Sequence, residues 1–428
     1  MPDSAPAEVS VLSEVSEVSE VGEVTLDDVR AARALLDGVS RTTPLEGSRV
    51  LTELVGGPVW LKCENLQRTG SFKIRGAYTR MARLSPAERS RGVVAASAGN
   101  HAQGVALAAS LLGLSALVVM PEAAPLPKVA ATRGYGAEVR LAGTSVDEAL
   151  VHARAHAAQT GAVLIHPYDH PDVVAGQGTV GIEIVEQCPD VRTVVVCTGG
   201  GGLLAGVAVA VKGLRPSARV VGAQAEGAAA WPASLKAGRP VPLLQMRTIA
   251  DGIAVGVPGD VPFAHISSLV DDIVTVGDEA LSRALLLCLE RAKLVVEPAG
   301  AAGVAAVTES PQAFEPPVVI VLSGGNLDPL LLDKVIRHGL VAAGRYLSLR
   351  VIVPDTPGAL AGLLDVLGAA GANVLDVVHR RTEAWLTLDE VLVAVDMETR
   401  GPGHAAEVRQ ALAAVGYRVQ ESTGSQPE

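Results

Sequence analysis

Lys73 is the residue of this sequence best suited to act as a nucleophile. It lies in the segment Ser-Phe-Lys-Ile-Arg-Gly (residues 71–76), directly after Phe72 and near the predicted start of a helix. Burial beside an aromatic ring lowers the pKa of a lysine, which makes the neutral amine available as a nucleophile or Schiff-base partner. A single lysine in an amphipathic helix is more often a surface residue. The assignment of Lys73 therefore depends on what other segments contribute.

Four consecutive glycines lie between a predicted buried strand and a predicted helix. They are Gly199, Gly200, Gly201 and Gly202, with Leu203 next in the chain. Backbone N–H groups at a helix N-terminus bind phosphate, and glycines let the backbone approach it closely. No Gly-Lys-Ser/Thr follows, which excludes a nucleotide P-loop. A dinucleotide site remains an alternative, since Gly200, Gly202 and Ala205 fit G-x-G-x-x-A, with Glu226 beyond them.

A second loop of small and polar residues follows another predicted strand and opens a helix. Its residues are Ser97, Ala98, Gly99, Asn100 and His101. Free N–H groups at such a helix start bind anions, among them a carboxylate. A plain turn with Asn100 as the helix cap explains the same residues equally well. This loop alone therefore leaves both possibilities open.

Ser323 opens a further loop, Ser-Gly-Gly-Asn (residues 323–326), after another buried strand. Its hydroxyl can meet a ring nitrogen there, although a glycine turn is the simpler explanation of this segment alone. Taken together, the lysine, both anion-type loops and the hydroxyl lie where α/β sheets place their sites. Pyridoxal 5'-phosphate (PLP) requires a Schiff-base lysine, a phosphate cup and a partner for its pyridine nitrogen. The combination therefore predicts a PLP site.

The elements that must position these residues alternate along residues 24–340. Thr25 is a plausible helix cap, with Asp28 placed to complete a capping box. Short apolar runs then alternate with helical stretches rich in Ala and Leu. The runs lie at residues 93–94, 117–119, 163–165, 194–196, 220–221 and 318–321. Continuous apolar runs are typical of parallel strands buried on both faces, so the sequence predicts an α/β unit with more than one sheet.

The segment after Arg345 has a different pattern. Residues 347–353 alternate in hydrophobicity as a half-buried strand does. A helix, two strands, a helix and a last strand are predicted to follow, ending near residues 417–419. The order β-α-β-β-α-β predicts a separate ferredoxin-like domain.

Length, charge and cysteine usage limit the class of protein. A chain of 428 residues predicts two or three domains. The net charge of −11, with no clustered basic run, argues against a nucleic-acid partner. The four cysteines are scattered without metal-ligand spacing, as reduced core residues are. We expect a cytoplasmic protein, since no apolar run is long enough for a membrane span and no signal-peptide pattern is present.

The motifs, taken in order, resemble those of the threonine dehydratases (threonine ammonia-lyases). This family has the PLP-dependent, tryptophan-synthase-β-like fold (fold type II). The matching segments are residues 62–70, 71–76, 97–104, 176–179, 199–203, 297–300 and 323–326. The resemblance covers about residues 26–340 and implies two catalytic domains with PLP between them. We expect a flexible tail at 1–23, a large PLP-binding domain at 24–79 and 166–340, and a small domain at 80–165.

The resemblance also implies a role for each site residue. Lys73 is expected to bind the cofactor covalently, with Phe72 packed against its ring. Asn100 is expected to donate to the phenolic oxygen, and Ser323 to face the pyridine nitrogen. The phosphate-binding residues would be Gly199, Gly200, Gly201, Gly202 and Leu203. The substrate carboxylate would lie at Ser97, Ala98, Gly99, Asn100 and His101.

The implied reaction converts L-threonine to 2-oxobutanoate and ammonia, and L-serine to pyruvate. Lys73 is then the expected base for the Cα proton. The preference between these substrates, and a role in isoleucine biosynthesis or in amino-acid breakdown, stay open. Related serine racemases carry a serine at the position of Ala98, and alanine cannot transfer a proton, which disfavours racemisation. Metal-dependent relatives carry a glutamate at Gln224, so we expect no required divalent metal.

Other readings stay open at this point. Within the fold they are serine racemase, cysteine synthase and threonine synthase. Outside it they are an NAD oxidoreductase built on the glycine loop and a non-catalytic amino-acid sensor. An NAD oxidoreductase would give Lys73 and Ser323 no role, and a non-catalytic sensor would leave the intact Lys73 unexplained.

Residues 346–428 resemble an ACT domain, a module that binds amino-acid effectors in many metabolic enzymes. The resemblance rests on Asp-Thr-Pro-Gly-Ala-Leu at 355–360 and Gly-Ala-Asn-Val at 371–374. The expected effector-binding residues are Asp355, Pro357, Gly358, Ala359, Leu360 and Asn373. The alternative is a ferredoxin-like oligomerisation module that binds no effector. In either case we expect a homo-oligomer, a dimer or a tetramer.

Overall fold

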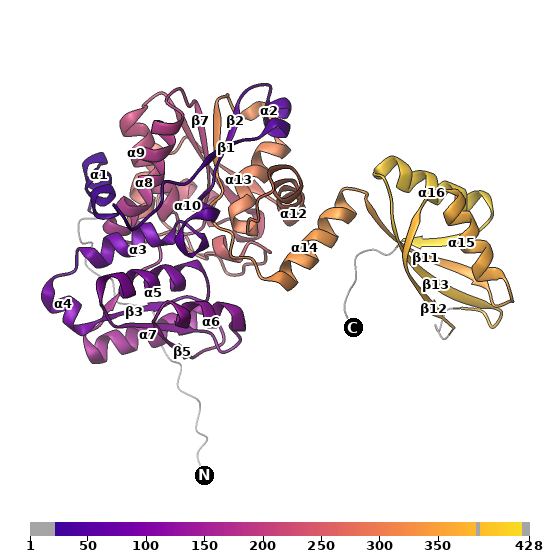
Figure 1. Cartoon of the computed structure of the whole chain (residues 1–428), viewed down its shortest axis with the longest axis horizontal. Helices are drawn as coiled ribbons and strands as arrows, with labels where there is room; N and C mark the ends of the chain where they lie inside the picture. Colours follow the sequence, from indigo (N-terminus) through magenta and orange to yellow (C-terminus); the bar gives the residue numbers. More distant parts are fainter. Residues whose placement is uncertain (1–21, 382–385, 422–428) are drawn as a thin grey trace, which may run out of the picture.

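The structure is a computed structural model that describes residues 22–381 and 386–421. The predicted flexible tail at 1–23 lies outside the described residues except for its last two positions. The chain forms three sheets, two of them in a catalytic unit and one in a C-terminal domain (Figure 1). No helix in the described part of the chain is long and apolar enough to cross a membrane.

A six-stranded sheet lies at the centre of the larger half, in the order β1-β2-β10-β7-β8-β9. The strands are β1 (Leu45–Gly47), β2 (Val59–Lys62), β7 (Thr193–Cys197), β8 (Arg219–Ala225), β9 (Asp272–Val276) and β10 (Val318–Val321). The edge strand β1 is antiparallel to β2, and the other neighbouring pairs are parallel. Every residue of β7 and β10 is buried, as the continuous apolar runs predicted.

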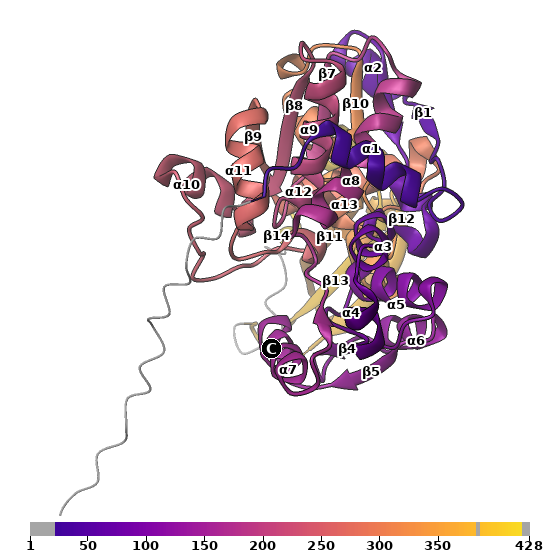
Figure 2. The same cartoon turned by 90° about the vertical axis from the view of Figure 1, so that its left-hand side faces the viewer.

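Helices cover both faces of this sheet. One group packs around α8 and α9 and the other around α12 and α13 (Figures 1 and 2). The first group is α1 (Leu26–Leu35), α8 (Pro171–Gln187), α9 (Gly202–Leu214) and α11 (Asp260–Leu269). The second is α2 (Arg49–Val55), α12 (Asp278–Leu287), α13 (Pro298–Glu309) and α14 (Pro329–Ala342). Figure 2 shows α10 (Ala230–Ala237) beside α11 at one edge of this half, where the rings of Trp231 and Phe263 stack.

The smaller half has a parallel sheet in the order β5-β4-β3-β6. Its strands are β3 (Val93–Ala96), β4 (Ala116–Met120), β5 (Glu138–Leu141) and β6 (Val163–Leu164). Its helices are α4 (Pro86–Arg91), α5 (Asn100–Leu112), α6 (Leu126–Gly134) and α7 (Val146–Thr160). Helix α3 (Lys73–Ala82) packs against both α5 and α8, so it lies between the two halves. The predicted domain boundaries remain predictions.

Several short helical turns connect these elements. The 3-10 turns are η1 (Glu64–Leu66), η2 (Arg68–Gly70), η3 (Glu226–Ala228), η4 (Asp251–Ile253) and η6 (Pro311–Ala313). A π-helical turn, η5 (Cys288–Ala292), extends α12. At the N-terminal end, Thr25 and Asp28 form the predicted capping box at the start of α1.

The C-terminal domain has the predicted β-α-β-β-α-β order and lies beyond α14 in Figure 1. Its elements are β11 (Tyr346–Pro354), α15 (Ala359–Ala369), β12 (Asn373–Arg380), β13 (Glu390–Glu398), α16 (Pro402–Ala414) and β14 (Arg418–Glu421). The antiparallel sheet has the order β12-β13-β11-β14. It has a core of its own, to which Leu349, Leu363 and Val408 belong. The predicted ferredoxin-like architecture is confirmed.

Candidate active site

A cavity of about 1010 Å³ lies between the two sheets of the catalytic unit. The residues that line it include every catalytic, cofactor-binding and substrate-binding residue predicted from the sequence. The predicted residues come from the start of α3, the loop after β3, the glycine loop after β7 and the segment after β10. These segments follow the C-terminal ends of parallel strands or open helices, where α/β proteins bind ligands.

Lys73 is the first residue of α3, and its side chain is held inside this cavity. Its Nζ donates a hydrogen bond to the carbonyl oxygen of Pro167 at 2.9 Å and lies 5.1 Å from the centre of the Phe72 ring. Burial lowers the pKa of Lys73 from 10.5 to about 8, although the charge of Glu297 opposes this shift. A substantial fraction of the amine is therefore neutral near pH 8, as a nucleophile requires.

Backbone contacts join the start of α3 to the end of β10. The N–H of Phe72 donates to the carbonyl oxygen of Ser323 at 3.2 Å, and Ser71 and Gly324 form an isolated β-bridge. Lys73 and Ser323 are thereby fixed relative to each other by the backbone. The two residues are far apart in the sequence and share one cavity because of these contacts.

The glycine loop has a shape that larger residues would not fit. The indole Nε1 of Trp231 donates to the carbonyl oxygen of Gly199 at 2.7 Å. The backbone N–H of Gly259 donates to the carbonyl oxygen of Gly200 at 3.1 Å. A Cβ atom at Gly200 would lie 2.5 Å from the ring of Tyr168, and Gly201 has a φ of +99°. Helix α9 starts directly after this turn, so its positive end faces the cavity. The loop is a suitable cradle for a phosphate.

Asn100 belongs to a hydrogen-bonded chain that joins the two halves of the catalytic unit. Its Nδ2 donates to Oε1 of Glu297 at 2.6 Å, and its Oδ1 accepts from Nδ2 of Asn326 at 2.8 Å. Burial and the nearby charge of Asp251 together raise the pKa of Glu297 to about 7, although the bond from Asn100 opposes this shift. Glu297 was not predicted as a cavity residue, although its segment, residues 297–300, was one of the matching motifs. Asn100 is the first residue of α5 and Gly99 is the helix cap, so the interpretation of Asn100 as the cap is wrong.

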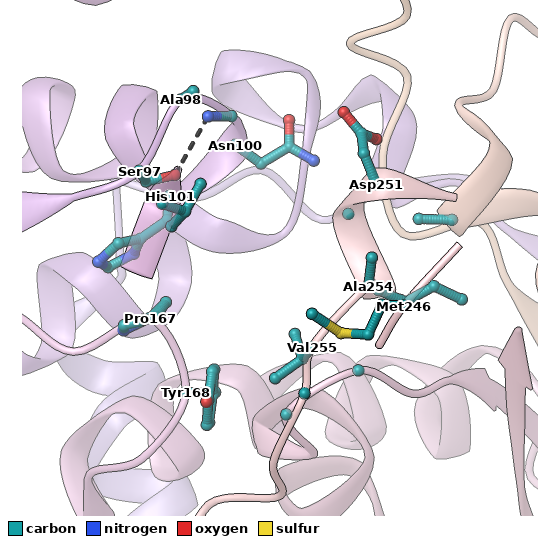
Figure 3. Close-up of a pocket in the computed structure, with 18 of the residues that line it drawn as sticks. Ser97, Ala98, Asn100, His101, Pro167, Tyr168, Met246, Asp251, Ala254 and Val255 are labelled. Carbon is teal, nitrogen blue, oxygen red and sulfur yellow. Dashed lines mark hydrogen bonds between the residues drawn. The ribbon is translucent and has the colours of Figure 1, made fainter. Parts of the chain in front are cut away.

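The loop from Ser97 to His101 forms one wall of the cavity (Figure 3). The N–H of Gly99 donates to Oγ of Ser97 at 3.1 Å. The His101 ring points away from the centre of the cavity, and its Nε2 lies 2.8 Å from the carbonyl oxygen of Ile165. Burial and the charge of Lys73 lower the pKa of His101 to about 3, so the ring is neutral. A carboxylate at this wall would meet backbone N–H groups and the Ser97 hydroxyl rather than an imidazolium.

The opposite wall contains residues that the sequence did not single out. Met246, Ala254 and Val255 form an apolar surface there, with Asp251 beside it (Figure 3). Lys128 of α6 donates to Oδ2 of Asp251 at 3.0 Å, which is a further link between the two halves. These residues lie in segments with no motif, so no sequence signal was available to find them.

The cavity residues fit PLP. Lys73 offers a partly neutral amine for the aldehyde, the glycine loop offers a cradle for the phosphate, and Ser323 offers a hydroxyl for the ring nitrogen. An amide nitrogen has two N–H groups, and Asn100 uses one on Glu297. The second is available for an oxygen of the cofactor.

Gln224, at the position where the family resemblance implies a glutamate in metal-dependent relatives, contacts the protein through its amide oxygen, whereas its buried Nε2 has no hydrogen-bond partner among the described residues. Its Oε1 accepts a hydrogen bond from the N–H of Trp231 at 3.1 Å, at the end of β8. Among residues 22–381 and 386–421, no cluster of three or more His, Cys, Asp or Glu side chains is arranged to hold a metal ion.

The predicted effector residues fall into two groups at opposite ends of the C-terminal sheet. Asp355 follows β11 and accepts a hydrogen bond from Nε of Arg381 at 3.3 Å. Asn373 starts β12 and donates to Oε2 of Glu398 at 2.9 Å, near the first residue of β11. Since β11 has nine residues, Asp355 and Asn373 are about 30 Å apart along the strand direction. Within one chain, a single amino acid cannot contact both Asp355 and Asn373.

Comparisons with known proteins agree with this geometry. Residues 36–324 match the family described as pyridoxal-phosphate dependent enzyme, and residues 347–414 match the ACT domain. The chain is 48% identical to the L-threonine ammonia-lyase of Thermotoga maritima over 396 residues, which cover 92% of this chain and 99% of that protein.

Solved structures lead to the same family. The processed form of threonine deaminase isoform 2 from Solanum lycopersicum is 36% identical with a TM-score of 0.71, covering 80% of this chain and 98% of that one. Maize serine racemase is 37% identical with a TM-score of 0.70, covering 74% of this chain and 98% of that one. The glycine loop thus belongs to a PLP enzyme and not to an NAD oxidoreductase. This chain belongs to the family of pyridoxal-phosphate dependent enzymes and carries a C-terminal ACT domain.

Proposed function

We propose that this enzyme is a threonine ammonia-lyase that converts L-threonine to 2-oxobutanoate and ammonia, with L-serine as a second substrate. The buried Lys73 amine in a cavity shared with the glycine loop and Ser323 carries the proposal. The 48% identity to an L-threonine ammonia-lyase over almost the whole chain supports the choice of substrate.

Each cavity residue has a task in this reaction. Lys73 Nζ attaches the cofactor and, when free, removes the Cα proton of the substrate. PLP, when bound, supplies the electron sink for the negative charge at Cα. The glycine loop would hold the phosphate of PLP, Phe72 would pack against the ring, Asn100 would donate to the phenolic oxygen and Ser323 would bind the ring nitrogen. Ser97 and the N–H groups of its loop bind the substrate carboxylate.

Racemisation of serine is the second candidate function, because maize serine racemase is a close structural neighbour. A racemase needs a group that returns a proton to the face of Cα opposite the lysine. Ala98 lines the cavity where related racemases carry a serine, and its methyl group holds no exchangeable proton. The ammonia-lyase reaction is therefore favoured over racemisation.

The decisive experiment is 2-oxoacid production by the purified, PLP-loaded protein, given L-threonine and L-serine separately. We expect 2-oxobutanoate from threonine, pyruvate from serine and no D-serine. Bound cofactor without either 2-oxoacid would refute the lyase activity and leave the PLP site intact. The ratio of the two rates would establish the substrate preference.

Regulation, assembly and location complete the proposal. An amino acid binding at the ACT domain shifts the catalytic unit between two states, and the Asp355–Leu360 loop is the proposed contact. Because Asp355 and Asn373 lie at opposite ends of the sheet, a site that uses both would combine residues of two chains. We therefore place the effector between ACT domains of a homo-oligomer, a dimer or a tetramer, in the cytoplasm.

A further inference from the structure

A buried contact joins Cys197 and Ser323 in the wall of the cavity. Cys197 Sγ lies 3.1 Å from Ser323 Oγ, and the two residues are 4% and 2% exposed. Cys197 ends β7 and Ser323 follows β10, and these strands are parallel neighbours. The sheet therefore fixes the contact, which the sequence does not reveal, since from sequence Cys197 is only a reduced core residue.

The direction of this hydrogen bond follows from the chemistry of its two groups. Burial raises the pKa of the Cys197 thiol to about 11, so the sulfur carries its proton at neutral pH. A thiol sulfur is a weak acceptor, whereas a hydroxyl oxygen accepts readily. Cys197 Sγ therefore donates to Ser323 Oγ. The proton of the Ser323 hydroxyl is left to point elsewhere.

We propose that Cys197 is a positioning residue that turns the Ser323 hydroxyl proton into the cavity. This inference rests on the proposed function, in which Ser323 faces the pyridine nitrogen of PLP. A proton donated at that point binds an unprotonated ring nitrogen. The bond that Ser323 accepts from Cys197 also strengthens the bond that Ser323 donates.

The reverse direction would have the opposite consequence. A hydroxyl that donated to the sulfur would present only lone pairs to the cavity, and it would suit a protonated ring. The direction of one buried hydrogen bond thus determines which form of the pyridine ring the site favours. Cys197 acts through Ser323 and needs no contact with the cofactor.

The S–H stretching band of the full-length protein, recorded by infrared spectroscopy without cofactor, tests the direction. A difference spectrum between the wild type and Cys197→Ala isolates this thiol, and Cys288→Ala isolates a buried thiol outside the cavity. We expect the Cys197 band to move to higher frequency in Ser323→Ala, while the Cys288 band does not move. An unchanged Cys197 band would overturn the proposal.

Cofactor affinity, measured by titrating the apoenzyme with PLP, tests the consequence. Cys197→Val fills the space without a donor, whereas Cys197→Ser keeps a donor. We expect Val to weaken PLP binding by roughly two- to tenfold and Ser to restore it, as the loss of one neutral hydrogen bond predicts. Cys288→Ala, the matched control, should bind PLP as the wild type does.

Two other outcomes are distinguishable. If Cys197→Val binds PLP as tightly as Cys197→Ser, or more tightly, then Cys197 is only a packing residue. That result would overturn the positioning role of Cys197 but not the proposed function. A wild-type protein that does not bind PLP at all would overturn the proposed function as well.

Discussion

Lys73 has two proposed tasks, which are to attach the cofactor and to remove the Cα proton. Its substitution tests both while the rest of the site stays in place. We expect Lys73→Ala to lower the rate of 2-oxobutanoate formation by about 10²- to 10⁴-fold, the usual contribution of a general base. The variant should also lack the absorbance of covalently attached cofactor. Lys212→Ala is the control, since Lys212 pairs with Asp271 outside the cavity. Full activity in Lys73→Ala would assign the base elsewhere.

The lowered pKa of Lys73 predicts how cofactor attachment depends on pH. Only the neutral amine attacks an aldehyde, so the rate of attachment to the apoenzyme should rise with pH. The rise should level off above about pH 8, where the buried amine is mostly neutral. Stopped-flow absorbance with PLP measures this rate, and a free lysine derivative provides the reference. A rate that rises steadily towards the ordinary pKa of 10.5 would contradict the effect of burial.

At the scale of residues, the motif residues of the site could be predicted from the sequence, but the contacts between different motifs could not. Lys73, Ser323 and the glycines each lie in a short segment whose local structure gives its residues a direct chemical meaning. The bond between Asn100 and Glu297 joins residues 197 positions apart and depends on how the two sheets meet. The Cys197–Ser323 contact likewise depends on strand order, which no local pattern encodes.

At the scale of elements, a buried ionic cluster holds α3 in place. The guanidinium of Arg75, two residues after Lys73, donates from Nε and Nη2 to Glu64 at 2.9 and 2.8 Å. Its Nη1 donates to Glu183 of α8 at 2.7 Å, and Lys62 of β2 donates to the other oxygen of Glu183 at 2.5 Å. The cluster connects α3 to β2 and α8, and it thereby fixes the position of Lys73, the first residue of α3.

This cluster predicts a large loss of stability when one cation is removed. Arg75→Met leaves the buried Glu64 carboxylate without its cation, and we expect the free energy of unfolding to fall by about 3–5 kcal/mol. Arg33→Met removes an exposed ion pair with Glu186, and we expect the free energy of unfolding to fall by only about 0–1 kcal/mol. Urea denaturation followed by circular dichroism compares the two variants. Similar midpoints for both would show that the buried cluster does not anchor α3.

Strand burial explains which elements the sequence predicted. Strands β7 and β10 are buried throughout and were predicted from their continuous apolar runs. Strands β5 and β9 lie at sheet edges and have exposed residues, so their apolar signal is weak. Strand β2 is buried but ends in Lys62, whose charge is paired with Glu183. Such pairing is a tertiary contact, which the sequence does not reveal, and the charged residue therefore hid an inner strand of the sheet.

At the scale of the whole molecule, the catalytic unit and the ACT domain have separate cores. Helix α14 leads from one to the other, and Arg345, just before β11, forms an ion pair with Glu290 of the π-helical turn η5. That turn precedes the segment that carries Glu297, the partner of Asn100 in the cavity. These contacts are where we expect a movement of the ACT domain to reach the active site.

Separate cores predict that the catalytic unit works without its ACT domain. A chain that ends at Gly344 should form 2-oxobutanoate from threonine but lose every response to amino acids. In the full-length chain we expect an effector to change the KM for threonine by about 5- to 150-fold, the usual range of allosteric coupling. Rates measured with each amino acid in turn provide the test.

Asp355→Ala in the full-length chain is the matched variant, because it removes a proposed effector contact and keeps the domain. We expect it to weaken the response and leave the basal rate unchanged, since Asp355 lies on the ACT sheet and outside the cavity. Coupling between the two binding equilibria must also be reciprocal, so threonine must change the Kd of the effector by the factor by which the effector changes the Kd of threonine. A truncated chain that keeps the full response would place the effector site in the catalytic unit, and the ACT domain would then serve assembly alone.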